Sequence, residues 1–233
     1  MALTRLKSTL SEEVYDSIRA DLLRGDLKPG SKLRLSDFTA RYRVSASVVR
    51  EALTRLAEQG LVTASPQRGF TVMSLSVEDL LDLTHARTLI ETMALREAIA
   101  DGDLSWESGV IASHHTLQRT DFLTPQGHVS EEWAEAHRDF HHRLLAGCKS
   151  TRLIAVATGL RECAELYLHW SRELTQDRDR DVAAEHQLIA DRAVSRDPVA
   201  ASDALRDHIE RTTAILVAYA TEQSEEARGE ASA

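Results

Sequence analysis

Four of the ten histidines in this chain lie where their imidazoles could act together as metal ligands. In AEAHRDFHHRLL, His137 and His141 are one helical turn apart, so a helix presents both on one face. His142 is rotated by about 100° from His141 and is expected to be solvated. His186 and His208 each lie on an apolar face of a separate later helix, so three successive predicted helices contribute inward-facing histidines.

The faces that carry these histidines are otherwise apolar at helical spacing. They comprise Trp133, His137, Phe140, His141, Leu144, Leu145 and Cys148; Val182, His186, Ile189 and Ala193; and Leu205, His208, Ile209, Thr212 and Leu216. A lone histidine on such a face is more often a core residue bonded to a neighbour, and this alternative stays open. An unpaired polar group in an apolar interior costs about 1–3 kcal/mol, however, and one shared ion would satisfy all four imidazoles. The pattern favours a divalent transition metal, zinc or nickel above others.

Arg87 is a further candidate for chemistry, because Glu91 follows it by one helical turn in LLDLTHARTLIETMALREA. One interpretation is an i, i+4 ion pair at the edge of an apolar stripe, which contributes about 0.3–0.5 kcal/mol. The other is an arginine that clamps the carboxylate of a small effector. The sequence leaves both interpretations open.

The elements before residue 75 follow a recognisable order. Ser11 is the expected N-cap of the first helix, and Pro29-Gly30 breaks the chain after it. The predicted helices are 11–25, 35–43 and 44–60, and a β-rich hairpin follows at 61–73 around SPQRG. Three helices and a hairpin in this order are typical of a winged helix-turn-helix.

The second helix of a helix-turn-helix lies in the DNA major groove, and here its start reads VSASVVRE. Arg50 lies one turn into this helix and can form two hydrogen bonds with a guanine. Arg68, at the tip of the hairpin, can enter the minor groove or clamp the backbone. The alternative for each arginine is a solvated surface charge. The candidate DNA-binding residues are Arg34, Arg43, Ser45, Ser47, Arg50 and Arg68, with Arg41 as a further phosphate contact.

Charge also distinguishes the predicted DNA-binding segment, residues 1–75, from the rest of the chain. Residues 1–75 hold 12 Lys and Arg against 8 Asp and Glu, a basic segment in a chain whose net charge is −9. A polyanion is therefore expected to meet only the N-terminal part. No run of about 18 apolar residues and no signal-peptide pattern occurs, so we expect no membrane association. Two cysteines are too few for a disulfide framework, which favours a cytoplasmic protein with reduced thiols.

The rest of the chain is predicted to be helical almost throughout. The expected helices are 77–101, 104–121, 130–147, 151–174, 178–195 and 198–223. The fold class is therefore mainly α: an N-terminal winged helix-turn-helix followed by an all-α bundle of six to seven helices that binds an effector. The expected domains are a DNA-binding domain at 1–75, a helical effector- and metal-binding domain at 76–224, and a flexible tail at 225–233.

The first part of the chain resembles the winged helix of GntR-type bacterial transcription regulators. The residues that carry the resemblance are YDSIRADLLRGDLKPGSKL, VSASVVREALTRLAEQGLV and RGFTV, and it extends from about residue 12 to 72. Ala46 is a departure, because the family usually has an arginine after the V-S pair. The resemblance implies DNA binding. Because Ala46 replaces that arginine, one base or phosphate contact is missing, and the resemblance does not define the operator sequence.

The second part resembles the FCD domain of the FadR-type branch, on HRDFHHRLL and AAEHQLIADRAVSRDPVAASDALRDHIERT. Many members bind a metal through one aspartate and three histidines, and His141, His186 and His208 match the histidine positions. His137 occupies the aspartate position, which favours borderline metals over magnesium or calcium. Alternatively the site is weaker and His137 bonds to the effector. Members commonly sense organic or sugar acids, which implies a small carboxylate effector at His137 and Arg87.

Together these expectations predict that the protein is a ligand-responsive repressor and not an enzyme. We expect a homodimer on double-stranded DNA with an inverted-repeat operator. One alternative is a constitutive DNA-binding dimer whose helical part is purely structural. A metal-dependent hydrolase is the other, but it needs a general base, and the histidine-bearing faces hold no glutamate at ligand spacing.

Overall fold

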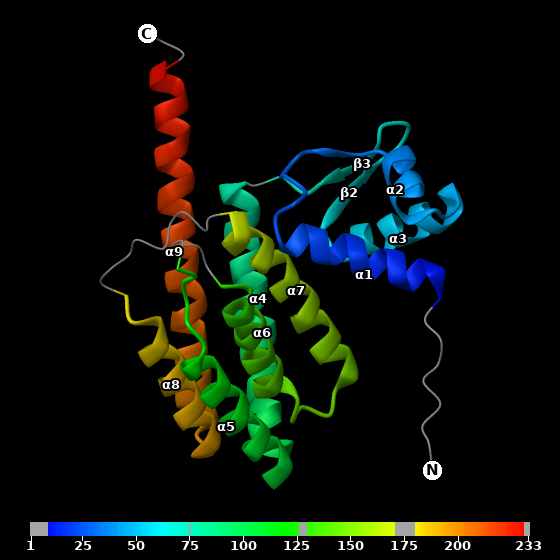
Figure 1. Cartoon of the computed structure of the whole chain (residues 1–233). Helices are drawn as coiled ribbons and strands as arrows, with labels where there is room; N and C mark the ends of the chain where they lie inside the picture. The colour runs from blue at the N-terminus through cyan, green and yellow to red at the C-terminus, as the bar shows by residue number, and fades with distance from the viewer. Residues whose placement is uncertain (1–8, 75, 126–129, 171–179, 231–233) are drawn as a thin grey trace, which may run out of the picture. The chain divides into compact units, whose positions relative to one another are not determined.

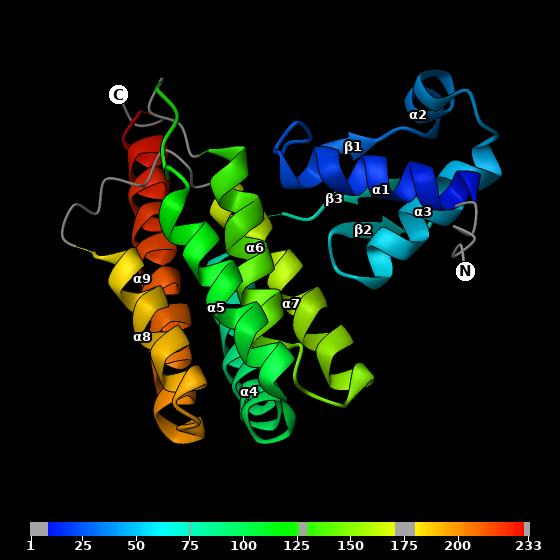
Figure 2. The same cartoon turned by 60° about the horizontal axis from the view of Figure 1, so that its bottom comes forward.

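The computed structural model describes residues 9–74, 76–125, 130–170 and 180–230, and the side chains among them except at 168–170 and 219–230. The chain divides into two compact units. One comprises Met1–Ser76 with Glu162–Trp170, and the other Val77–Arg161 with Ser171–Ala233. The predicted fold class is confirmed: a winged helix-turn-helix precedes an all-helical unit (Figures 1 and 2).

The first unit contains three helices and a small antiparallel sheet. The helices are α1 (Leu10–Leu23), α2 (Leu35–Tyr42) and α3 (Ala46–Glu58), and the strands are β1 (Lys32–Leu33), β2 (Val62–Ser65) and β3 (Gly69–Val72). The sheet order is β1-β3-β2. One apolar face of each of α1 and α3 forms the core, with fully buried Ile18, Leu22, Val49, Leu53 and Leu56. This packing fixes α3, the predicted recognition helix, on the other two helices and the wing.

One local prediction for this unit was wrong. Thr9, not Ser11, caps α1, because its hydroxyl accepts a hydrogen bond from the Glu12 amide at 3.2 Å. Thr9 and Glu12 have the spacing of a capping box, whereas Ser11 is buried within the first turn. The predicted hairpin is confirmed as β2 and β3, and β1 adds a third strand, since Leu33 pairs with Phe70.

Helices α4 to α9 belong wholly or mostly to the second unit. They are α4 (Val77–Asp101), α5 (Leu104–Arg119), α6 (Glu131–Leu145), α7 (Thr151–Trp170), α8 (Val182–Val194) and α9 (Pro198–Glu230). In both views α4 lies beside α9, which in turn contacts α8, and α5 contacts α6 and α8 (Figures 1 and 2). This arrangement encloses an apolar core around Phe140, Ile189 and Leu205.

Some helix ends differ from the sequence-based expectation. α8 begins at Val182 rather than 178, because the Asp181 carboxylate caps it by accepting from the Ala184 amide at 2.9 Å. α9 continues to Glu230, so residues 225–230 are helical rather than part of a flexible tail. Residues 171–174 of the predicted fourth helix lie outside the described residues. Within the described residues, no helix is both long and apolar enough to cross a bilayer.

Candidate functional site

Helix α6 positions two of the predicted histidines. Ser130 caps this helix, and its hydroxyl accepts a hydrogen bond from the Trp133 amide at 3.2 Å. From this fixed start, His137 and His141 both lie on the buried face, and His142 is exposed as expected. The ring of Trp133 stacks on His137 with a centroid distance of 4.8 Å, which limits the rotation of that imidazole.

Helices α8 and α9 supply the other two histidines. His186 is 2% exposed and His208 is 7% exposed, so both rings are inside the bundle. Asp181 caps α8, and Asp197 accepts a hydrogen bond from the Ala200 amide at the start of α9. Since α8 packs against α9, the two histidines meet, with ring centroids 4.7 Å apart.

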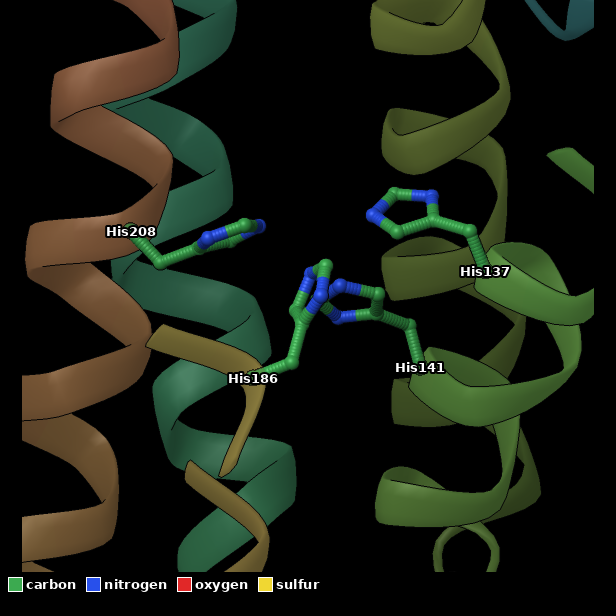
Figure 3. Close-up of side chains that lie close together, drawn as sticks. All are labelled: His137, His141, His186 and His208. Atoms are coloured by element: carbon green, nitrogen blue, oxygen red, sulfur yellow. The ribbon is translucent and has the colours of Figure 1, made fainter. Parts of the chain in front are cut away.

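The structure brings all four predicted histidines into one cluster, which we call the histidine cluster: His137, His141, His186 and His208. One nitrogen from each ring lies within 4.8 Å of the corresponding nitrogens of the other three. Figure 3 shows the rings pointing toward one another from α6, α8 and α9. The sequence predicted this convergence from the helical faces alone.

Burial keeps the imidazoles of the histidine cluster neutral. Burial lowers the pKa of His137 and His141 well below its ordinary value. The same cause lowers the pKa of His186 to about 2. Burial also lowers the pKa of His208, although its hydrogen bond to Glu185 opposes the shift. Neutral imidazole is the form that coordinates a metal ion, so the cluster is already in its ligand state at neutral pH.

Unpartnered nitrogens point to a shared ion. The Nε2 atoms of His141 and His186 are buried and have no hydrogen-bond partner among the described residues. Four nitrogens at about 2.0–2.1 Å from one tetrahedral zinc ion lie about 3.3–3.4 Å apart. The ligand nitrogens of the cluster lie within 4.8 Å of one another, so each pair needs to close by about 1.5 Å at most. Four neutral nitrogen donors fit zinc, nickel or copper and do not fit magnesium or calcium, which prefer oxygen.

The i, i+4 ion pair between Arg87 and Glu91 is present, but it is buried rather than at the edge of an apolar stripe. Arg87 is 7% exposed, and its Nε donates to the Glu91 carboxylate at 2.6 Å. Arg161 on α7 donates to the other oxygen of Glu91 at 3.3 Å. Arg87, Glu91 and Arg161 thus form a buried ion triad. Arg161 lowers the pKa of all four clustered histidines, which places this cation beside the cluster.

Several residues of the site were missed by sequence analysis. Arg161 gave no signal, because its partner Glu91 lies 70 positions away on another helix. His114 was given no role, yet it is buried, its Nε2 has no described partner, and its ring lies 5.3 Å from that of Phe140. The apolar positions Val110 and Leu117, one turn to either side, were the available signal for this histidine.

Glu185 was also missed, and both of its oxygens accept hydrogen bonds. Arg180 donates to the two oxygens at 2.9 and 2.6 Å, and His208 Nδ1 lies 2.8 Å from Oε2. Burial by itself would raise the pKa of Glu185, but the bonds from His208 and Arg180 outweigh it and hold the pKa well below its ordinary value. The carboxylates of Glu185 and Glu91 are thus both engaged by arginines, and neither is a free general base.

In the first unit, every predicted DNA-binding residue is exposed. The six are Arg34, Arg43, Ser45, Ser47, Arg50 and Arg68. Ser45 is the N-cap residue of α3, and its hydroxyl bonds to that of Ser47 at 2.8 Å rather than to a helix amide. The first amides of α3 therefore remain available to a phosphate. Arg68 lies at the wing turn before Gly69, whose φ is +85°.

Arg41 has a structural partner, unlike the other arginines of this surface. Its Nη1 donates to the buried Asp21 carboxylate at 2.5 Å, which ties α2 to α1. Arg24 and Tyr42 also bond to Asp21. By contrast, Arg43 and Arg50 form no ion pair with any described residue, so their guanidinium groups are free to meet DNA.

Comparison with known proteins matches both units. Residues 10–72 match the family described as bacterial regulatory proteins, gntR family, and residues 82–211 match the FCD domain. The HTH-type transcriptional regulator BphR of Paraburkholderia xenovorans (strain LB400) is 36% identical, over 89% of this chain and 85% of its own length. The HTH-type transcriptional repressor GlaR of Escherichia coli (strain K12) is 34% identical, over 84% of this chain and 90% of its own length.

The fold also resembles solved structures. Escherichia coli McbR/YncC superposes with a TM-score of 0.76 over 90% of this chain and 98% of its own, at 21% identity. A putative transcriptional regulator GntR from Rhodococcus sp. RHA1 gives a TM-score of 0.71 over 91% of this chain and 99% of its own, at 22% identity. Similarity at this level of identity supports the fold.

Proposed function

We propose that this chain, a transcription regulator that belongs to the GntR family of bacterial regulatory proteins and carries an FCD domain, is a metal-dependent sensor of a small carboxylate. In this proposal it acts as a repressor, the function named for its relative GlaR. Residues 1–75 bind DNA, and residues 76–224 bind a divalent transition metal, preferably zinc or nickel, and an organic or sugar acid.

The observation that carries this proposal is the histidine cluster. It gathers four neutral imidazoles inside the bundle, and at least two of their nitrogens have no hydrogen-bond partner in the part of the chain that the structure describes. A structural core would leave those nitrogens unsatisfied, at a cost of about 1–3 kcal/mol each. A bound divalent ion would supply an electrophilic site for a carboxylate oxygen. The chain's own contribution is to hold the four donors and to exclude water.

The ion triad beside the cluster supports an anionic effector. Arg87 uses Nε for Glu91, and its two Nη atoms bond to no described residue. A carboxylate that enters beside Arg87 could accept hydrogen bonds from both of its Nη atoms. Both arginines lower the pKa of His137, and we assign this histidine as the one that would meet the effector.

The DNA-binding half of the proposal rests on the exposed residues of the first unit. Arg50 would bond to guanine O6 and N7 in the major groove, and Arg68 would contact the adjacent minor groove or backbone. Two chains in a homodimer would place their recognition helices on the half-sites of an inverted repeat. The effector acts by binding one arrangement of the dimer more tightly than the other. Such a protein works on the chromosome and so in the cytoplasm.

The experiment that tests the proposal combines metal and effector binding. Metal-free protein is screened by thermal shift against small organic and sugar acids, with and without added Zn²⁺ or Ni²⁺. The proposal predicts that an acid raises the unfolding temperature only when metal is present, and that the same acid changes operator affinity. If neither metal nor any acid changes stability or DNA binding, the constitutive DNA-binding dimer becomes the correct description. The hydrolase alternative is excluded by the family, whose members are regulators.

A further inference from the structure

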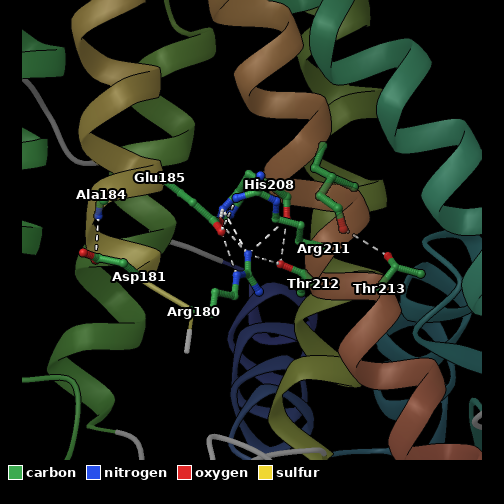
Figure 4. Close-up of polar contacts among 9 residues, drawn as sticks. Arg180, Asp181, Ala184, Glu185, His208, Arg211, Thr212 and Thr213 are labelled. Atoms are coloured by element: carbon green, nitrogen blue, oxygen red, sulfur yellow. Dashed lines mark hydrogen bonds and ion pairs between the residues drawn. The ribbon is translucent and has the colours of Figure 1, made fainter. Parts of the chain in front are cut away.

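Glu185 lies immediately before His186 on α8, and its carboxylate is not among the groups that could share an ion. Its Oε2 lies 2.8 Å from Nδ1 of His208 on α9 (Figure 4). Its Oε1 accepts from Arg180 Nε at 2.9 Å and from Arg211 Nη1 at 3.3 Å. Glu185 is therefore not among the four donors, and it contacts one of them from behind.

The two arginines fix the charge and position of this carboxylate. Arg180 is itself held in place, because its Nη2 donates to Glu185 Oε2, to the backbone carbonyl of His208 at 3.2 Å and to the Thr212 hydroxyl at 3.0 Å. Arg211 donates from the next turn of α9. Glu185 is thus held as a carboxylate that can only accept hydrogen bonds.

Two groups lie near His208 Nδ1: Glu185 Oε2 at 2.8 Å and Arg180 Nη2 at 3.4 Å, and the much shorter contact with the carboxylate decides where the proton of His208 resides. A carboxylate that accepts a hydrogen bond from Nδ1 requires the proton on Nδ1, which leaves the lone pair on Nε2. Figure 3 shows the far end of the His208 ring directed at the other three rings. The ring is thus both oriented and tautomerically prepared to present Nε2 inward. Histidine ligands of metal sites are commonly held in this way by a carboxylate behind them, and loss of it weakens metal binding by about 10–100-fold.

A purely structural ion pair between α8 and α9 is the competing explanation. Arg180 and Arg211 would suffice for that role, and the imidazole would not need to take part. The carboxylate instead reaches both arginines and His208 at once, in a position that is only 10% exposed.

We propose that Glu185 is a positioning residue of the histidine cluster: it keeps His208 in the Nδ1–H tautomer, with Nε2 as the donor atom for the ion. The inference rests on the proposed metal site and adds a residue to it. Glu185 acts through His208 and does not itself bind the metal.

The test measures metal affinity and tautomer in the full chain. Zn²⁺ affinity is obtained by competition with a chromogenic chelator for the wild type, Glu185→Gln and Glu185→Ala. Asp203→Asn is the matched control, because Asp203 is an exposed carboxylate on α9 that pairs with Arg206. We expect about 10–100-fold weaker binding for Glu185→Ala. Glu185→Gln keeps a hydrogen-bond acceptor but loses the charge, so its Zn²⁺ affinity should lie between those of Glu185→Ala and the wild type. Asp203→Asn should bind Zn²⁺ as tightly as the wild type does.

Nitrogen NMR of the metal-free wild type reports the tautomer of His208 independently of any variant's folding. The Nδ1–H form supports the proposal, and an Nε2–H form overturns it whatever the affinities are. Unchanged Zn²⁺ affinity in both folded Glu185 variants also overturns it. Absence of Zn²⁺ and Ni²⁺ binding in the wild type would instead refute the proposed metal site, and the positioning role with it.

Discussion

Arg50 is the residue on which sequence-specific DNA recognition depends in this account. It is exposed in the first turns of α3 and has no ion-pair partner among the described residues. We predict that Arg50→Ala weakens binding to the operator by about 1–3 kcal/mol, because a two-hydrogen-bond contact with guanine is lost. Fluorescence anisotropy at fixed salt, with operator and random duplexes, measures the effect.

The control for this prediction is Arg206→Ala, which removes a partly exposed arginine from α9, outside the first unit. It should leave both affinities unchanged. An equal loss on operator and random DNA in Arg50→Ala would show that Arg50 contacts phosphate rather than a base.

His141 and His142 form a matched pair for testing the sensor. They are adjacent on α6, but His141 is 1% exposed and lies in the cluster, whereas His142 is exposed. We predict that His141→Ala keeps operator binding and loses the response to the effector, since one of four donors is removed. His142→Ala should behave as the wild type in the same mobility-shift assay. A His141→Ala protein that still responds normally would contradict a sensing role for the cluster.

At the scale of single elements, the end of α3 depends on glycine. Gly60 has φ of +78°, a region that other residues adopt only with strain. We predict that Gly60→Ala lowers the free energy of unfolding by about 1 kcal/mol or more. Gly159→Ala is the control, because Gly159 lies within α7 with open space at its Cβ position, and it should be neutral or stabilising. Urea denaturation measures both, and equal effects would argue against strain at Gly60.

Helices α6, α8 and α9 together enclose four imidazoles, and this gives the metal-free protein a characteristic pH dependence. Burial lowers the pKa of all four histidines in the folded state, so the folded protein binds fewer protons than the unfolded chain below about pH 6.5. The contribution of these histidines to the free energy of unfolding is therefore fully present above that pH and is lost as the pH falls. Each histidine adds a slope of up to about 1.4 kcal/mol per pH unit.

We predict that the unfolding temperature of the metal-free protein is constant from pH 8 to about pH 7 and falls steeply below about pH 6.5. Differential scanning calorimetry at several pH values checks this prediction. Replacing His186 by Asn should make the slope shallower. An unfolding temperature that does not change between about pH 7 and pH 5 would show that the imidazoles are not held neutral by burial.

The elements and the four histidines could be predicted from sequence because both depend on local periodicity. A period of 3.6 residues decides which face His137 and His141 occupy, without knowledge of any other helix. Pairings between distant segments leave no such pattern. Arg161 finds Glu91 across 70 positions, and Glu185 meets His208 across 23. The strand β1, with two residues, is also too short to show an alternation of period two.

At the scale of the whole molecule, charge is distributed according to function. The segment 1–75 is basic within an acidic chain, so DNA contacts are confined to the unit that carries the recognition helix. The proposed effector site is in the helical unit, so effector binding and DNA binding would be linked by a shift in the populations of two arrangements of the protein. An effector can shift DNA binding only to the extent that its affinity differs between the competent and the incompetent arrangement.

The most direct test of the central claim is a calorimetric titration of the metal-free protein with Zn²⁺ or Ni²⁺. The account predicts saturable binding of one ion per chain at the histidine cluster. That binding should be lost in His141→Ala and retained in His142→Ala. No saturable binding in the wild type, or the same binding in His141→Ala, would contradict the account.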